Sequence, residues 1–401
     1  MRKLWSVVTA LAVFLPGAAW AADVVVWHAY RGGEKAAFEK VVAMYNARPG
    51  APAKVTTLAV PYDAFADKIT AAVPRGKGPD VFIFAQDRLG GWIAAGNTID
   101  PIDFYVDDAL KARFIPSTIE AMTYRGSLWG LPLNYKCLAL IYNKKLVQTP
   151  PKTTAELVAL AKKMTDKSAG RFGLAYWYSN YYFHAALQNG FGGRVFDAGK
   201  PVMDAPENVK AAEYLQGWIK EGFVPPEPSD TLVTSLFNQG KTPMVFSGNW
   251  FLGEIESGVD YAVDVLPAIS EAGGKPMRPW TTVEGVYVAA PSKVKEAAFD
   301  FVKYLTDLDA AKVMAIEGRQ SPANTKVYAD PAVAKDPVLA AYKKQVDVAI
   351  PMPNLPEMTL VWSPATTAMG TIVRGGDAKA ALTKAQEKVV ADVANLHKTK
   401  P

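Results

Sequence analysis

The sequence of 401 residues is poor in cysteine and histidine. Its only cysteine, Cys137, has no second cysteine with which to form an intramolecular disulfide. The 3 histidines, His28, His184 and His397, are far apart and show neither HExxH nor Cys/His spacing, so we predict no metal site. Cys137 lies in the apolar stretch YKCLALIYN, which is typical of a small buried hydrophobic residue.

Motifs for catalysis and for nucleotide cofactors are also missing. There is no GxSxG elbow, and the stretch NQGKT lacks the glycine that a P-loop needs five positions before Gly240, where Ser235 stands. The glycine pairs do not give the dinucleotide-binding spacing. We therefore predict no cofactor and no enzyme activity. A pair of distant carboxylates has no local signature, so a secreted glycoside hydrolase stays an alternative.

Long hydrophobic runs are confined to the N-terminus. Residues 1–21 combine two basic residues, an apolar run from Leu4 to Leu15 and small residues before Ala22, which is typical of a signal peptide. No later segment approaches the roughly 20 apolar residues of a spanning helix. We predict cleavage before Ala22 and export to the periplasm. Because no cysteine stands at the cleavage site, we predict no lipid anchor.

A strong charge of either sign is absent as well. The formal net charge of +5 falls to +3 once Arg2 and Lys3 leave with the signal peptide. Such a mild balance argues against a nucleic-acid partner, which usually requires a basic stripe. The remaining chain is longer than one hydrophobic core usually serves, so the default expectation is two domains.

Strand and helix patterns alternate after the signal peptide. The apolar stretches 23–30, 53–60 and 81–84 predict strands, with helices within 32–50 and around 65–72. This order favours parallel strands covered by helices on both faces. The first part of the chain is therefore predicted to form one α/β lobe.

The same alternation begins again after residue 146. A capping box at Thr153 and Glu156 predicts a helix that runs through Met164. The later elements predict a second α/β lobe with a helical C-terminal part. They are strands at 171–177, 242–250 and 259–269 and helices at 208–221, 297–318 and 377–396.

Aromatic residues are abundant, with 10 Trp, 17 Tyr and 17 Phe. Several stand in polar, loop-like contexts: Tyr181 and Tyr182 in WYSNYYF, Trp250 in SGNWF and Trp362 in LVWSPA. Sugar rings pack their C–H faces on aromatic rings, and their hydroxyls pair with planar polar groups. Such groups occur in Asp87-Arg88, directly after the apolar strand 81–84, where open α/β sheets place their ligands. The combination indicates sugar binding.

Several stretches together resemble one known family. They are GPDVFIFAQDRLGGW, RGSLWGLPL, LALIYNKKLV, PPKTTAEL, FNQGKTPMVFSGNW, VLPAI and MPNLPEMTLVW, in the family's order along nearly the whole mature chain. The chain resembles the extracellular solute-binding proteins of sugar ABC transporters (family 1), and most closely the maltose/maltodextrin-binding members. The resemblance implies a type II periplasmic-binding-protein fold: two α/β lobes, each a mixed sheet flanked by helices, with the ligand cleft between them.

The resemblance also implies domain boundaries. The chain would cross between the lobes near Tyr135, Glu284 and Pro337. The N-terminal lobe would contain residues 22–134 and 284–333, and the C-terminal lobe residues 135–283 and 334–401.

Carried over position by position, the resemblance implies a sugar site. Asp87 would accept hydrogen bonds from sugar hydroxyls, Arg88 would donate to them, and Trp250, Trp362 and Tyr182, next to Tyr181, would stack on sugar faces. At other positions this sequence departs from the family, which implies a less acidic cleft and leaves the exact sugar open. These departures are Phe84 for tryptophan, Lys136 and Asn180 for glutamates, Arg31 for aspartate and Thr366 for arginine.

The implied function is that of a monomeric binding protein. It would close on a malto-oligosaccharide or similar glycan and deliver it to a membrane permease with two ATPase subunits. An anionic sugar or a glycerol phosphoester as ligand, and a chemoreceptor as partner, stay alternatives.

Overall fold

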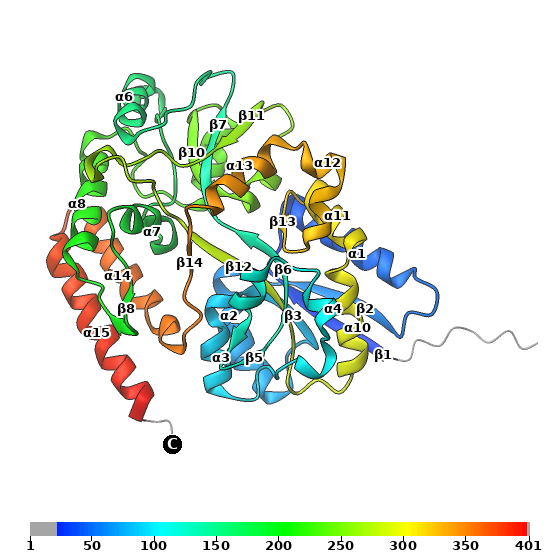
Figure 1. The fold of residues 1–401 in the computed structure, drawn as a ribbon. Helices are drawn as coiled ribbons and strands as arrows, with labels where there is room; N and C mark the ends of the chain where they lie inside the picture. Colours follow the sequence, from blue (N-terminus) through cyan, green and yellow to red (C-terminus); the bar gives the residue numbers. More distant parts are fainter. Residues whose placement is uncertain (1–21, 399–401) are drawn as a thin grey trace, which may run out of the picture.

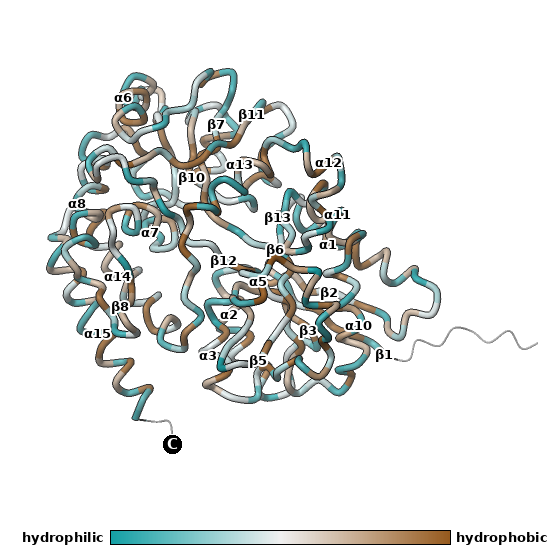
Figure 2. The backbone as a smooth tube through the Cα atoms, in the orientation of Figure 1, coloured by the Kyte–Doolittle hydropathy of each residue, from teal (hydrophilic) through white to brown (hydrophobic). Residues whose placement is uncertain are grey.

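The computed structural model describes residues 22–398, which form two lobes side by side (Figure 1). The predicted signal peptide, residues 1–21, lies outside the described residues. Hydrophobic stretches run through the interior of both lobes, while many outer loops are hydrophilic (Figure 2). Within residues 22–398, no helix has both the length and the apolar character that crossing a membrane requires.

The first lobe is built on a 7-stranded sheet with the order β13-β6-β12-β3-β1-β2, in which β14 also pairs with β12. Strands β1, β2 and β3 are parallel, as their spacing in the sequence predicts, and β12 runs antiparallel to both β3 and β6. All residues of β3 are buried, which explains its continuous apolar sequence. The strands are β1 (Ala22–His28), β2 (Ala53–Ala59), β3 (Val81–Ala85), β6 (Leu131–Lys136), β12 (Trp280–Val288), β13 (Ser321–Pro322) and β14 (Ile350–Pro351).

Helices pack around this sheet in Figure 1. Helix α1 buries Ala37, Phe38, Val41, Val42 and Tyr45, the residues whose helical spacing predicted it. The helices of this lobe are α1 (Gly32–Asn46), α2 (Tyr62–Ala72), α3 (Leu89–Ala95), α4 (Asp108–Lys111), α5 (Pro116–Ala121), α10 (Lys295–Leu305) and α11 (Leu308–Ile316). A short hairpin joins β4 (Thr123–Tyr124) and β5 (Ser127–Leu128).

The second lobe holds a 3-stranded antiparallel sheet with β7 (Leu138–Asn143) between β10 (Met244–Gly248) and β11 (Tyr261–Asp264). Its helices are α6 (Thr154–Met164), α7 (Tyr181–Gly190), α8 (Pro206–Glu221), α9 (Asp230–Asn238), α13 (Pro337–Val346), α14 (Trp362–Val373) and α15 (Ala378–Lys398). Helix α12 (Pro331–Ala334) leads into α13, and β8 (Phe196–Asp197) pairs with β9 (Lys200–Pro201).

Local sequence signals hold in part. Helix α6 begins as predicted, because Thr153 Oγ1 accepts a hydrogen bond of 3.2 Å from the Glu156 amide. The Glu156 carboxylate accepts from the Lys152 amide, whereas a capping box would use the Thr153 amide. The strand predicted at 171–177 is wrong. Only isolated bridges form there, Arg171 with Asp166 and Ala175 with Val245, and the chain then turns at Tyr176, whose carbonyl accepts from the Tyr178 amide.

The buried residues form four groups, and the two largest are the main cores of the lobes. The first lobe's core includes Phe38, Phe82 and Val286, while Leu140, Phe246 and Ile372 belong to the second. The predicted two-lobed α/β architecture is confirmed. The boundaries near residues 135, 284 and 337 stay predictions.

Candidate ligand-binding site between the lobes

Asp87 and Arg88 lie in a 3-10 turn (Gln86–Arg88) that follows β3 directly. Asp87 is 3% exposed, and its Oδ2 accepts a hydrogen bond of 3.1 Å from the Trp362 indole nitrogen in the other lobe. Arg88 Nε also lies 3.1 Å from this oxygen, but without the alignment of a hydrogen bond, so it keeps a free donor. Burial raises the pKa of Asp87, although Arg88 and the Trp362 indole act in the opposite direction.

The second lobe contributes a cluster of rings, Tyr182, Trp250, Trp280 and Trp362, which we call the aromatic cluster. The Tyr182 ring lies 6.0 Å from that of Trp250 and 6.1 Å from that of Trp280, which in turn lies 5.9 Å from that of Trp362. Tyr182, Trp250 and Trp362 are only partly buried, whereas Trp280 is 2% exposed and supports the other rings from below.

The two sides of the site meet through Trp362. Its indole donates to Asp87, and the Arg88 guanidinium lies 5.6 Å from its ring centre. Burial raises the pKa of the Tyr182 hydroxyl, and the charge of Asp87 acts in the same direction, so both groups lie in one electrostatic environment. Apolar ring faces and a fixed acceptor and donor therefore converge between the lobes, as binding of a polar ligand with flat apolar faces requires.

A buried ion cluster holds Lys136 beside this region. Its Nζ lies 3.0 Å from Glu34 Oε1 and 3.3 Å from Glu284 Oε1. Glu284 also accepts hydrogen bonds of 2.7 Å from the Tyr30 hydroxyl and 2.8 Å from the Asn134 amide. Burial lowers the pKa of Lys136, but the two carboxylates outweigh it and raise the pKa, which keeps the ammonium charged. Lys136 is therefore committed to protein partners.

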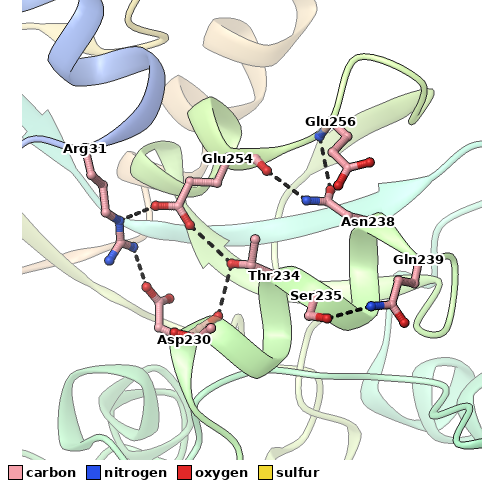
Figure 3. A pocket seen from close by; sticks show the side chains of 9 residues that line it. Arg31, Asp230, Thr234, Ser235, Asn238, Gln239, Glu254 and Glu256 are labelled. Atoms are coloured by element: carbon pink, nitrogen blue, oxygen red, sulfur yellow. Dashed lines mark hydrogen bonds and ion pairs between the residues drawn. The ribbon is translucent and has the colours of Figure 1, made fainter.

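Arg31 forms a second ion cluster, which joins the lobes. It precedes α1 of the first lobe and pairs with Asp230 of α9 and with Glu254 of the 3-10 helix Asn249–Glu254, both in the second lobe (Figure 3). These residues line a polar hollow of about 460 Å³. Beside them a Cβ on Gly32 would lie only 2.9 Å from the Gly253 carbonyl oxygen, so the lobes approach closely where side chains are absent.

These clusters change the charge that the sequence implies for the cleft. Each of the cations, Arg31 and Lys136, contacts two carboxylates, so neither is an uncompensated positive charge. Residue-by-residue comparison misses this compensation because the partner acids Glu34, Asp230 and Glu254 stand at other positions of the sequence. The less acidic cleft that the resemblance implies stays a prediction, but Arg31 and Lys136 do not contribute free positive charge to it.

Not all predicted site residues join the site. Asp87, Arg88, Tyr182, Trp250 and Trp362 converge, whereas Tyr181 is 1% exposed and donates from its hydroxyl to Gln188 in the core. Phe84 is buried beneath Tyr62, Asn180 caps α7 by accepting from the Tyr182 amide at 2.9 Å, and Thr366 is exposed on α14.

Sequence reasoning missed Tyr62, Trp280, Glu34 and Glu284. Of these, only Trp280 and Tyr62 carried a signal, as aromatics beside prolines. Within residues 22–398, no group of acidic, histidine or cysteine side chains is suited to hold a metal ion.

The Arg31 ion cluster leads to a salt-dependent prediction. Because Asp230 and Glu254 bind Arg31 across the lobes, the double substitution Asp230→Asn with Glu254→Gln should weaken ligand binding by about twofold to fivefold, typical of partly exposed ion pairs. Titrations at low ionic strength and at about 1 M salt measure the effect, which screening should remove at high salt. The exposed pair Lys144–Asp260, whose two residues both belong to the second lobe, offers a control in Asp260→Asn. An effect of the same size at both salt concentrations would contradict the prediction.

Two α/β lobes with polar and aromatic side chains of both converging between them define a protein that encloses a small ligand between its lobes. The comparisons with known proteins agree. The family of bacterial extracellular solute-binding proteins matches residues 31–312, and the chain belongs to this family. The family membership that the sequence stretches predict is thus confirmed.

Individual relatives cover most of the chain. It is 32% identical to a maltotriose-binding protein of Pyrococcus abyssi over 92% of this chain and 82% of the relative. It is 28% identical to a galactooligosaccharide-binding protein of Bacillus subtilis, over 86% of this chain and 85% of the relative. Among solved structures, a Thermus thermophilus maltotriose-binding protein bound to maltotriose matches with a TM-score of 0.85 at 28% identity, covering 92% of this chain and 100% of that one. A maltose/maltodextrin-binding domain from Bdellovibrio bacteriovorus has the same fold, with a TM-score of 0.86 at 24% identity. This match covers 93% of this chain and 100% of that one.

Proposed function

We propose that this protein binds a neutral malto-oligosaccharide between its lobes and delivers it to a sugar ABC importer. The observation that carries the proposal is the meeting of the aromatic cluster with Asp87 and Arg88 across the lobes, at the Trp362–Asp87 hydrogen bond. The rings offer faces for the C–H surfaces of a pyranose, and the Asp-Arg pair offers an acceptor and a donor for its hydroxyls. The ligands named for the Pyrococcus and Thermus relatives support a glucose oligomer.

The mechanism follows from contacts with both lobes. A sugar that touches Asp87 on one lobe and Trp250 on the other binds the closed arrangement more tightly than an open one, and so shifts the population toward closure. The permease and its ATPase subunits then recognise the closed monomer. The sequence of residues 1–21 supports delivery to the periplasm by a cleaved signal peptide without a lipid anchor.

Titration with maltotriose, followed by tryptophan fluorescence, tests this function directly. We expect saturable binding, because Trp250 and Trp362 lie at the site. No response up to millimolar maltotriose would overturn the proposal. A galacto-oligosaccharide forms a second arm, which the Bacillus relative motivates. Incubation with a maltodextrin should give no shortened products, since we propose a binding protein and not a hydrolase.

An anionic sugar or a glycerol phosphoester is the second candidate ligand, and the charges of the site argue against it. The cations that would attract an anion, Arg31 and Lys136, are already paired with carboxylates, and Arg88 lies beside Asp87. A uronic acid and glycerol phosphate belong in the titration panel. Binding of either more tightly than maltotriose would favour this alternative.

The raised pKa of Asp87 predicts that sugar binding weakens in acid. Hydroxyl groups donate to the ionised carboxylate, so bound sugar favours that form, and affinity falls as the pH drops through the pKa of Asp87 in the free protein. Burial places this pKa above the ordinary value of about 3.9. Calorimetric titration with maltotriose from pH 7.5 downward, wherever circular dichroism shows a folded protein, should reveal the loss.

The variant Asp87→Asn serves as the matched control for this pH dependence. It should bind more weakly than the wild type at pH 7.5 and show a flatter dependence on pH, because the titrating group is gone. If the wild type and Asp87→Asn lose affinity in parallel on acidification, another group governs the effect.

A further inference from the structure

Tyr62 is an exposed aromatic residue at the first position of α2, directly after Pro61. It is 56% exposed, in contrast to Phe84, the residue that the sequence places at the site, which is 3% exposed. The Tyr62 ring stacks on the Phe84 ring with 5.0 Å between centroids and 29° between planes. Phe84 is therefore covered by Tyr62 and does not present its own face to a ligand.

A third ring fixes this pair from below. Phe65, one turn further along α2 and fully buried, stacks on Phe84 with 4.9 Å between centroids and 1° between planes. The rings Phe65, Phe84 and Tyr62 thus form a stack that starts in the core and ends at the surface. The buried Phe84 ring, which Phe65 supports in turn, packs on the inner face of Tyr62 and holds its outer face in one orientation. Such a face needs no ordering when a ligand binds.

The outer end of this stack lies at the site between the lobes. Strands β2 and β3 both run parallel to β1, so Tyr62, which follows β2, and Asp87, which follows β3, lie at the same edge of the sheet. The stacking of Tyr62 on Phe84, three residues before Asp87, brings its ring to the end of β3 where Asp87 meets Trp362 of the aromatic cluster. Phe104, which is 93% exposed, shows no such relation to the site. Tyr62 is therefore the exposed ring that the first lobe places opposite the aromatic cluster.

We propose that Tyr62 is the sugar-stacking residue of the first lobe and that Phe84 acts beneath it as its positioning residue. This inference rests on the proposed function and adds a specificity determinant to it. A pyranose clamped between Tyr62 and the rings of the second lobe must have a flat C–H face on each side, which glucose units provide. The phenol hydroxyl adds a donor and acceptor beside Asp87 and Arg88 that a phenylalanine at this position would lack.

Maltotriose titrations of single variants test the assignment. Tyr62→Ala should raise the Kd by about tenfold or more, Tyr62→Leu should rescue little of the loss, and Tyr62→Phe should stay within about threefold of the wild type, because the ring face carries the contact. Phe104→Ala, which removes an exposed ring elsewhere, should leave the Kd unchanged. Since Tyr62 and Phe104 are both exposed, all these variants should stay folded, which thermal unfolding without ligand checks.

The support from Phe84 has its own readout. Phe84→Leu should raise the Kd severalfold. In the double variant, Tyr62→Ala should raise the Kd by a smaller factor than it does alone, because Tyr62 without its support contributes less to binding. Strictly additive effects would remove Phe84 from the assignment. If the wild type binds maltotriose and Tyr62→Ala binds it equally well, Tyr62 is not the stacking residue. If the wild type does not bind, the proposed function itself fails.

Discussion

Replacement of Trp362 by alanine should weaken maltotriose binding by about a hundredfold, the scale of a central aromatic anchor. Trp362 has two roles that no other residue of the site combines. Its ring contributes a platform in the aromatic cluster, 5.9 Å from Trp280, and its indole N–H donates to the buried Asp87. The alanine variant loses the platform and leaves the Asp87 carboxylate with one donor fewer. Calorimetry or tryptophan fluorescence measures the resulting Kd.

Phenylalanine at the same position separates the two roles. Trp362→Phe keeps a ring but loses the N–H, so we expect a loss of about tenfold, the cost of an unpaired buried acceptor. Phe104→Ala, remote from the site, controls for general effects of removing an aromatic side chain. A Kd for Trp362→Ala within threefold of the wild type would show that the ligand does not rest on this ring.

The second large effect concerns stability and rests on the two buried histidines. His28 is 0% exposed and His184 is 1% exposed, and burial lowers the pKa of each to about 4. The unfolded chain takes up a proton at each histidine near pH 6.5, whereas the folded protein resists it until about pH 4. Stability is therefore fully present above pH 6.5 and is lost as the pH falls toward 4. Each histidine should cost about 2 kcal/mol between pH 7.5 and 5.

Urea unfolding at pH 7.5, 6 and 5 measures this loss. The variants His28→Asn and His184→Gln, singly and combined, should each reduce the slope of the unfolding free energy against pH, whatever their effect on stability at pH 7.5. The slope is the informative quantity because it counts protons taken up on unfolding. Slopes in the double variant equal to those of the wild type would assign the acid loss to other groups.

Much of the fold follows from local sequence. The parallel order of β1, β2 and β3 and the start of α6 at Thr153 depend on apolar periodicity and on capping, which involve residues close together in the chain. The segment 171–177 shows the limit of such reasoning. It has the composition of a strand, yet it forms only the isolated bridges of Arg171 with Asp166 and of Ala175 with Val245, and the turn at Tyr176 ends its run beside β10.

The candidate site likewise follows in part from local sequence and in part from tertiary structure. The sequence by itself places Asp87 and Arg88 at the end of β3 and supplies the aromatic residues. Which of those residues face the ligand is decided by the tertiary structure. Tyr181 and Tyr182 are neighbours, but successive residues of a helix point about 100° apart, so one enters the core and the other joins the aromatic cluster.

The charge of the cleft depends on tertiary structure even more. Arg31 and Lys136 read as added positive charges in the sequence, but their partners Asp230, Glu254, Glu34 and Glu284 come from distant segments that only folding brings together. The sequence alone thus determined the class of fold and the types of side chain at the site. The tertiary structure decided which rings are exposed and which charges are compensated, because burial and ion pairing are properties of contacts between residues far apart in the chain.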